Sequence, residues 1–265
     1  MIPYITIPDL PILGPIGVHA FGVMVAAAVL AGIHLGKKYA PVFGETPEDV
    51  DSLSTWVLIG GFLGAHLVDR LFYFPGEVAK NPWTLIEIWD GLSSFGAGLG
   101  GAVGIVAWTI RRRKPFVAMG DLTASILPVS WGLGRVGCAL VHDHLGIRTS
   151  ASNPFAVAFP DGPRYDLGFL EMLFWGVLSL VFWRAWRKPH PRGTYIAWLL
   201  TAYMPVRFGL DFLRVDDARY AGLTPAQWLC MVIFVAGLAV SWRIATRGRA
   251  PAPPAAPSPT AGRVP

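Results

Sequence analysis

The segment AMGDLTASILPVSWGLGRVGC, residues 118–138, decides the fold of this chain. It is mostly apolar and close to the roughly 20 residues that a helix needs to cross the hydrocarbon core of a bilayer. Six further segments of similar character flank it, at about 18–36, 53–74, 93–110, 167–186, 193–213 and 225–243. The sequence therefore predicts an all-α, multi-pass membrane protein of about seven transmembrane helices.

The composition agrees with lipid as the solvent. Of the 265 residues, 53% are hydrophobic and only 15% are charged, whereas soluble domains carry about 25% charged residues. The net charge of +5 comes from basic residues that flank apolar segments, which is a pattern of membrane topology, so we expect no nucleic-acid partner. The two cysteines, Cys138 and Cys230, lie in apolar context and are predicted to be small buried residues.

The two ends differ from the central domain, residues 18–243. Residues 1–17 are rich in proline and isoleucine and are expected to lie along the membrane interface. They lack the basic stretch that begins a cleavable signal peptide, so we expect them to be retained. Residues 244–265 are too rich in proline and alanine to pack, and a disordered cytoplasmic tail is predicted.

The positions of lysine and arginine predict the orientation. The loops after the first, third, fifth and seventh segments hold 14 of the 22 basic residues. These residues are Lys37, Lys38, Arg111, Arg112, Arg113, Lys114, Arg184, Arg187, Lys188, Arg192, Arg243, Arg247, Arg249 and Arg263. Since cytoplasmic loops carry the excess of Lys and Arg, the N-terminus is predicted to be periplasmic and the C-terminus cytoplasmic.

Glycines predict how two of the helices meet. Gly60 with Gly64, and Gly100 with Gly104, have the small-xxx-small spacing that allows helix backbones to approach closely. Close packing is one interpretation of the run GAGLGGAVG at residues 96–104. The alternative is backbone that a lipid head group can reach.

Segment 193–213 carries a stripe of polar residues. Tyr203, Arg207, Asp211 and Arg214 occur at i, i+4, i+8 and i+11, which places them on one face of a helix. Ionisable residues inside membrane segments usually mark a pathway or a site. The alternatives are an ion pair along the helix between Arg207 and Asp211 and an Arg214 that extends to the interface.

Segment 118–138 provides a second arginine on the same side of the membrane. Trp131, Arg135, Cys138 and His142 would share one face if the helix continues that far. Two converging guanidinium groups suit a phosphate, which they bind with a planar fork of donors. Without an anion Arg135 and Arg207 would repel each other, so a lipid phosphate is the predicted counter-ion.

The loop that follows contains His142, Asp143 and His144, which could hold or move a proton near neutral pH. Such a run also suggests zinc, but zinc ligands are usually more widely spaced and this loop contains no cysteine, so we expect no metal and no cofactor. Glu171, at the start of the next segment, is expected to pair with an arginine.

Several stretches together resemble the bacterial prolipoprotein diacylglyceryl transferases. They are HAFGVMV (19–25), GFLGAHLVDRLFY (61–73), DLTASILPVSWGLGRVG (121–137), YMPVRFGLDFLR (203–214) and TPAQWLCM (224–231). Their order and spacing match the family over nearly all of residues 17–243.

The resemblance implies a reaction in the bacterial inner membrane. Members of this family transfer diacylglyceryl from phosphatidylglycerol to the thiol of a prolipoprotein signal-sequence cysteine and release glycerol 1-phosphate. It also implies a lateral opening to membrane lipid and a polar cavity that faces the periplasm. Phosphatidylglycerol and the prolipoprotein cysteine are therefore the expected partners.

The resemblance also implies roles for individual residues. Arg135 matches the arginine that holds the phosphatidylglycerol head group, and Arg207 matches the essential arginine that follows Tyr203. The candidate site thus has Arg207, Asp143, His142 and Tyr203 as catalytic residues, Arg135, Arg207 and Arg214 as phosphate ligands, and Asp211, Glu171 and His144 as supporting residues.

The chain departs from the family pattern at residues linked to proton transfer. Gly96 stands where the family has its key histidine, and Cys138 stands where it has an asparagine. His142, His144 or His66 is a candidate to take over the missing role. The departures leave two alternatives to the transferase: a diverged relative that uses another acceptor, and a non-catalytic phospholipid-binding membrane protein.

Overall fold

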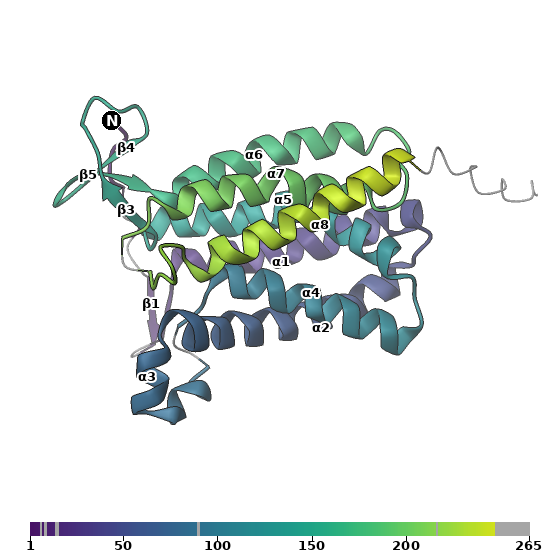
Figure 1. Ribbon diagram of the computed structural model, residues 1–265, viewed down its shortest axis with the longest axis horizontal. Coiled ribbons are helices and arrows are strands. Elements are labelled where there is room, and N and C mark those ends of the chain that lie inside the picture. Colours follow the sequence, from purple (N-terminus) through teal and green to yellow (C-terminus); the bar gives the residue numbers. More distant parts are fainter. Residues whose placement is uncertain (6, 8–9, 14–15, 89–90, 216, 247–265) are drawn as a thin grey trace, which may run out of the picture.

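The structure, a computed structural model, describes residues 1–5, 7, 10–13, 16–88, 91–215 and 217–246. Seven long helices form the bundle within these residues (Figure 1). They are α1 (Ala20–Tyr39), α2 (Pro47–Val68), α4 (Ser94–Arg112), α5 (Phe116–Val141), α6 (Leu167–Ala185), α7 (Thr194–Asp211) and α8 (Pro225–Thr246). Each coincides with a predicted segment to within a few residues, so the predicted pattern of helices is confirmed.

Five stretches of the described chain are long and apolar enough to cross a membrane. They are Ala20–Phe43, Pro47–Tyr73, Phe116–Val141, Leu167–Ala185 and Pro225–Thr246. Two long helices are not among them: α4, which is rich in glycine, and α7, which carries the polar stripe. The chain is therefore a mostly helical membrane protein.

Short elements join the long helices. They are η1 (Ala40–Phe43), η2 (Asp69–Tyr73, a turn of π-helix), α3 (Pro75–Lys80) and η3 (Pro82–Leu85). The predicted cytoplasmic tail begins at residue 244, but α8 continues to Thr246. The remainder, residues 247–265, lies outside the described residues.

The prediction of an all-α fold missed a small β-layer. A hairpin is formed by β1 (Leu10–Leu13) and β2 (Ile16–Val18), and an antiparallel sheet has the order β3-β5-β4, with β3 at Leu145–Arg148, β4 at Ala156–Phe159 and β5 at Gly162–Asp166. This sheet lies at the end of the bundle where α5 ends and α6 begins, which we call the sheet end (Figure 1). Ile2 extends it, because its N–H donates to the Ala156 carbonyl at 2.7 Å. Strands of three to five residues are too short to give a periodic signal.

Helices α2 and α4 pack with their backbones in contact. A Cβ placed on Gly60 would lie 2.5 Å from the Gly100 carbonyl oxygen, and one on Gly64 would lie 2.6 Å from the Gly100 Cα. The predicted close packing through small residues is therefore confirmed. Gly96 belongs to the same contact, since a Cβ there would lie 2.7 Å from the Val68 Cβ.

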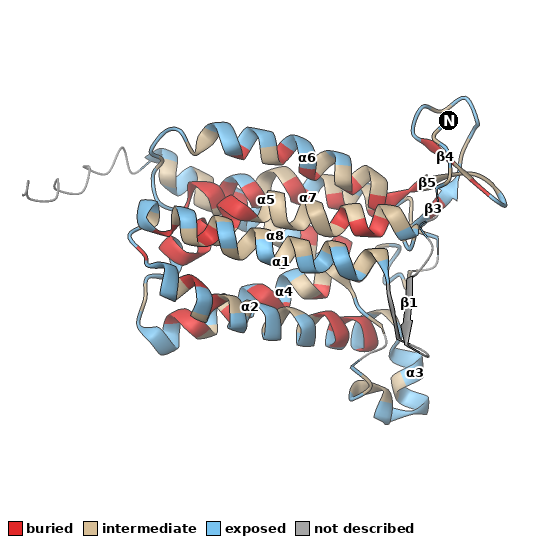
Figure 2. Cartoon of the chain, turned by 180° about the vertical axis from the view of Figure 1, so that it is seen from behind, coloured by how far each residue is buried: buried red, intermediate tan, exposed pale blue. Residues whose placement is uncertain are grey.

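Helices α1, α6 and α7 pack against α5, and α8 packs against α7. Trp175 and Phe182 of α6 and Tyr195 and Tyr203 of α7 form a buried aromatic core beside it. Asp121 of α5 accepts hydrogen bonds from the backbone N–H groups of residues 193 and 196 and so fixes the start of α7. Buried residues lie mainly on inward faces, and exposed residues on outward faces (Figure 2). Many of those exposed residues are large and apolar, as expected of a surface that contacts lipid.

Candidate functional site

Buried charged residues of three helices meet near the sheet end. Arg135 lies in the last two turns of α5, Glu171 in the second turn of α6, and Arg207 in the last two turns of α7. They are 2%, 1% and 2% exposed, respectively. Buried charges need partners, so their contacts define what the site can do.

Arg135 has a partner on each of its donor nitrogens. Its Nε lies 2.8 Å from Glu171 Oε2, and its Nη2 donates to Ser94 Oγ at 2.8 Å. Its Nη1 faces Cys138 Sγ at 3.6 Å. The hydroxyl of Tyr203 donates to the same Glu171 oxygen at 3.0 Å. The predicted pairing of Glu171 with an arginine is confirmed.

Arg207 pairs with a different carboxylate, that of Asp211. Its Nη1 contacts Asp211 one turn further along α7, and Asp211 also accepts a hydrogen bond from the hydroxyl of Thr224. The Glu171 carboxylate interacts electrostatically with both arginines. The predicted convergence of the two guanidinium groups is therefore seen, but their counter-ions belong to the protein. The lipid phosphate as a further counter-ion stays a prediction.

Arg214 lies just beyond the end of α7 and has a separate partner. Its Nε is 2.7 Å from Asp217 Oδ2 and 4.0 Å from Asp211 Oδ1. Its backbone forms an isolated bridge with Gly146 in β3. Arg214 is thus tied to the sheet, and its role as a phosphate ligand stays a prediction.

His142 does not share the helix face of Arg135 and Cys138. Helix α5 ends at Val141, and His142 adopts a left-handed conformation with φ of 52°. Its Nδ1 lies 2.5 Å from Asp166 Oδ2, and its Nε2 lies 3.1 Å from the Ile5 carbonyl oxygen. The predicted continuous face fails because the helix stops one residue before His142. Its catalytic role stays a prediction.

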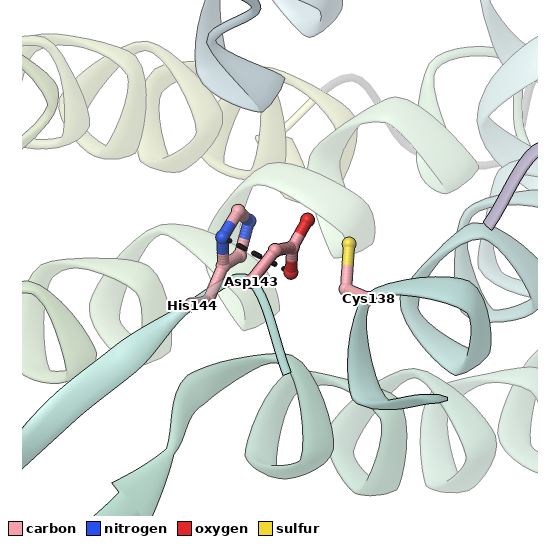
Figure 3. Close-up of side chains that lie close together, drawn as sticks. All are labelled: Cys138, Asp143 and His144. Atoms are coloured by element: carbon pink, nitrogen blue, oxygen red, sulfur yellow. Dashed lines mark ion pairs between the residues drawn. The ribbon is translucent and has the colours of Figure 1, made fainter. Parts of the chain in front are cut away.

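Asp143, His144 and Cys138 form a compact cluster (Figure 3). Each has a potential ligand atom within 4.8 Å of those of the other two, and Asp143 Oδ1 is 3.3 Å from His144 Nδ1. Burial raises the pKa of the Asp143 carboxyl, although Arg135 opposes this shift. Burial, together with the positive charges of Arg135 and Arg214, lowers the pKa of His144 to about 3. His144 is therefore a neutral imidazole at physiological pH.

An apolar cavity of about 510 Å³ leads to this cluster. Its walls come mainly from α1, α2 and α5, and one end is polar. The polar lining near Arg135 consists of Ser93, Ser94, Arg135, Cys138, Asp143 and His144, and Ser54, Thr123 and Ser130 line the cavity elsewhere. Ser93 caps α4 by accepting a hydrogen bond from the Gly96 N–H at 3.2 Å, while Ser94 contacts Arg135. The arrangement suits a molecule with long apolar chains and an anionic head.

The fold and site define a helical membrane protein whose apolar cavity ends at a buried arginine. Residues 8–243 match the family described as Prolipoprotein diacylglyceryl transferase, and the chain belongs to this family. The family resemblance inferred from the motifs is confirmed.

Curated relatives cover most of the chain. It is 32% identical over 242 residues to the phosphatidylglycerol–prolipoprotein diacylglyceryl transferase of Pseudomonas aeruginosa (strain LESB58), an alignment that spans 86% of this chain and 90% of the relative. The enzyme of the same name from Nitratidesulfovibrio vulgaris (strain DSM 19637 / Miyazaki F) is 31% identical over 257 residues, with 92% and 95% covered.

The structure explains what sequence reasoning missed about two departures from the family pattern. Gly96, in place of the family histidine, lies against α2, where a Cβ would overlap the Gly64 carbonyl and the Val68 side chain. Cys138, in place of the asparagine, lies beside Asp143 in the cavity. Sequence reasoning treated Cys138 as an inert buried residue. The signal that could have identified it was its position one turn after Arg135.

Proposed function

We propose that this protein transfers diacylglyceryl from phosphatidylglycerol to the cysteine thiol of a prolipoprotein signal sequence, as its relatives' names state for them. The observation that carries the proposal is the apolar cavity that ends at Arg135. The acyl chains lie along the walls formed by α1, α2 and α5, and the lipid enters laterally between helices. The phosphate faces the polar end.

Arg135 is the proposed phosphate ligand. It is buried, permanently charged and fixed by Glu171 and Ser94, so its donors need little reorganisation as the reaction proceeds. The departing phosphate gains negative charge when its ester bond to the diacylglyceryl carbon breaks. Arg207 and Tyr203 do not contact the phosphate directly in this proposal. They interact with Glu171, which holds Arg135 in place. Arg214 adds positive charge near the same end of the cavity.

The acceptor thiol must lose its proton, because the thiolate is the nucleophile. We assign this role to Asp143 and its neighbour His144, which line the cavity beside Arg135. His142 and Asp211 support this end of the site through Asp166 and Arg207, respectively. The sulfur–carbon bond forms as the carbon–oxygen bond breaks, and glycerol 1-phosphate leaves with the electron pair.

We further propose seven membrane crossings, with the N-terminus in the periplasm and the tail in the cytoplasm of a bacterial inner membrane. Two residues that contact each other outside the membrane lie on the same side of it. The chain between them therefore crosses the membrane an even number of times. His142 contacts Ile5, and α1, α2, α4 and α5 lie between these residues. The backbone of Ile147 bonds to that of Leu213 at 2.8 Å, and α6 and α7 lie between them. The number of crossings is even in both cases only if α4 and α7 also cross the membrane.

The test is a transfer assay with purified protein, phosphatidylglycerol and a peptide that carries the lipoprotein cysteine motif. We expect the thioether product, and we expect Arg135→Ala to abolish it. Arg148→Ala is the matched control, since Arg148 pairs with Asp161 on the exposed sheet. The Pseudomonas aeruginosa relative serves as the positive control.

Gly96 is the observation that favours the two alternative functions, because the family histidine is absent. Phospholipid binding without product, under conditions in which the positive control works, would identify a non-catalytic lipid-binding protein. A product on a different acceptor would identify a diverged transferase.

A further inference from the structure

The Cys138–Asp143–His144 cluster has the chemistry of a metal site. Thiolate, carboxylate and imidazole are all zinc ligands, and catalytic zinc sites combine three protein ligands with one open position. The Asp143 and His144 ligand atoms, 3.3 Å apart, already have the spacing of two ligands on one ion. The ligand atoms of the cluster lie within 4.8 Å of one another, so closure around zinc needs a movement of about 1 Å.

The three residues face the space that the substrates would occupy. All three line the apolar cavity, together with Arg135 and Ser94. Among the described residues, His144 Nε2 is a buried nitrogen with no hydrogen-bond partner. The ring nitrogen that faces Asp143 is Nδ1, so Nδ1 is the zinc ligand and Nε2 lies on the side of the ring away from the metal. The sequence suggested His142, Asp143 and His144 as the possible zinc ligands. In the structure His142 pairs with Asp166, and Cys138 takes its place as the third ligand.

The cluster offers two anionic ligands to a dication, and Arg135 and Arg214 are the positive charges that act on it. The Cys138 thiolate and the Asp143 carboxylate together neutralise a divalent ion. Arg135 keeps Glu171 as its own counter-ion at 2.8 Å, so it does not compete for Asp143. Its Nη1 lies 3.6 Å from Cys138 Sγ, so its charge would add to that of the metal in neutralising a thiolate there.

We propose that Cys138, Asp143 and His144 bind one zinc ion, whose fourth position faces the cavity and takes the acceptor thiol. The inference rests on the proposed function. The bound thiol gives its proton to water, because a coordinated thiol is deprotonated. Its sulfur then attacks the diacylglyceryl carbon, and the carbon–oxygen electron pair leaves with glycerol 1-phosphate. Zinc stays divalent throughout, and the thioether product, which has no charge on sulfur, leaves the metal.

This assignment explains how the reaction proceeds without the family histidine. The α2–α4 contact leaves no room for a side chain at Gly96, so a proton acceptor cannot come from that position. The metal lowers the pKa of the substrate thiol directly and removes the need for a strong base. With zinc bound, Asp143 and His144 act as ligands, and water takes the thiol proton in place of the Asp143 carboxylate.

The first test measures metal binding without reference to activity. Purified full-length protein is stripped with a chelator and titrated with Zn²⁺ and with Co²⁺. We expect one ion per chain and, with Co²⁺, a thiolate-to-cobalt absorption band. Cys138→Asn, which restores the residue typical of the family, should weaken Zn²⁺ binding by about 100-fold or more, since loss of a direct ligand exceeds the 10- to 100-fold effect of outer partners. Cys230→Ala, which removes the other cysteine, should bind as the unaltered protein does.

The second test separates the metal site from the proposed function. Transfer should stop in the chelated protein and return with Zn²⁺ but not with Mg²⁺. Full transfer by the chelated protein would overturn the zinc inference and leave the proposed function intact. Absence of stoichiometric Zn²⁺ binding would do the same. If zinc binding depends on Cys138 but the protein transfers nothing in any metal state, the zinc site is supported. The role of zinc in the transfer reaction is then overturned.

Discussion

A single methyl group at Gly96 tests the close contact of α2 and α4. In Gly96→Ala the new Cβ would overlap the Gly64 carbonyl, lie 2.7 Å from the Val68 Cβ and lie 3.1 Å from the Ala65 Cα. Two of these atoms are backbone, so the contact can be relieved only if the helices separate. Added atoms in a well-packed region cost about 1–3 kcal/mol.

A second effect opposes the first. Alanine gains about 1 kcal/mol over glycine in a helix interior. Because α2 offers no flexible side chain at the closest point, we take the upper half of the packing cost and expect a net loss of about 1–2 kcal/mol. In a protein of this size, that loss lowers Tm by about 2–8 °C.

The matched control lies two residues further along the same helix. A Cβ on Gly98 would meet only the Trp131 side chain, at 3.7 Å, which is an ordinary contact. Gly98→Ala should therefore keep or raise Tm. Thermal unfolding of both variants in the same detergent, followed by helical circular dichroism, gives the comparison. Equal Tm values for the two variants would refute the reasoning. Gly96→His should lose more stability than Gly96→Ala, since it adds a ring to the same space.

Three other outcomes follow from the buried charges. Asp211→Asn should reduce the free energy of unfolding by about 3–5 kcal/mol, because Arg207 loses its partner inside the bundle; denaturant titration measures this, and a loss below 1 kcal/mol would contradict it. His144 has a pKa of about 3 in the fold against an ordinary 6.5, so the unfolded chain takes up the proton first and stability falls as pH decreases below 6.5. At pH 5 the effect is on the order of 1–2 kcal/mol, and His144→Gln should show a correspondingly flatter dependence of Tm on pH. Lys114→Ala should cost only about 0.5–1 kcal/mol despite its contacts with Glu45 and Asp49 at 3.0 and 2.8 Å, because the ion pair is partly solvated; a larger change in Tm than that of Asp211→Asn would reverse the assigned order.

The long helices could be predicted because a bilayer imposes a length and an apolar composition that are visible in the sequence. The i, i+4 spacing of Arg207 and Asp211 offered an ion pair as the alternative to a functional stripe, and that ion pair is present. Glu171 was recognised as a partner for an arginine, because a carboxylate buried among apolar residues requires one. These features depend on local spacing, which the sequence contains.

Features that depend on where a helix stops could not be predicted. His142 directly follows the last residue of α5 in a left-handed conformation, and its imidazole lies against Asp166. The contacts of His142 with Asp166 and with the Ile5 carbonyl come from other parts of the chain. The left-handed turn at His142 is also followed by the approach of His144 to Cys138. Sequence spacing alone gave no reason to group them.

The contact between Ile5 and His142 has a consequence for the order of assembly. These residues are 137 positions apart, and Ile2 pairs with β4 still further along. During synthesis Ile2 and Ile5 have no partner in β4 or at His142 until α1, α2, α4 and α5 have been made. The pairing of Ile2 with β4 can therefore form only after α5 and β4 have been made, so this end of the molecule, which holds His142, is completed late.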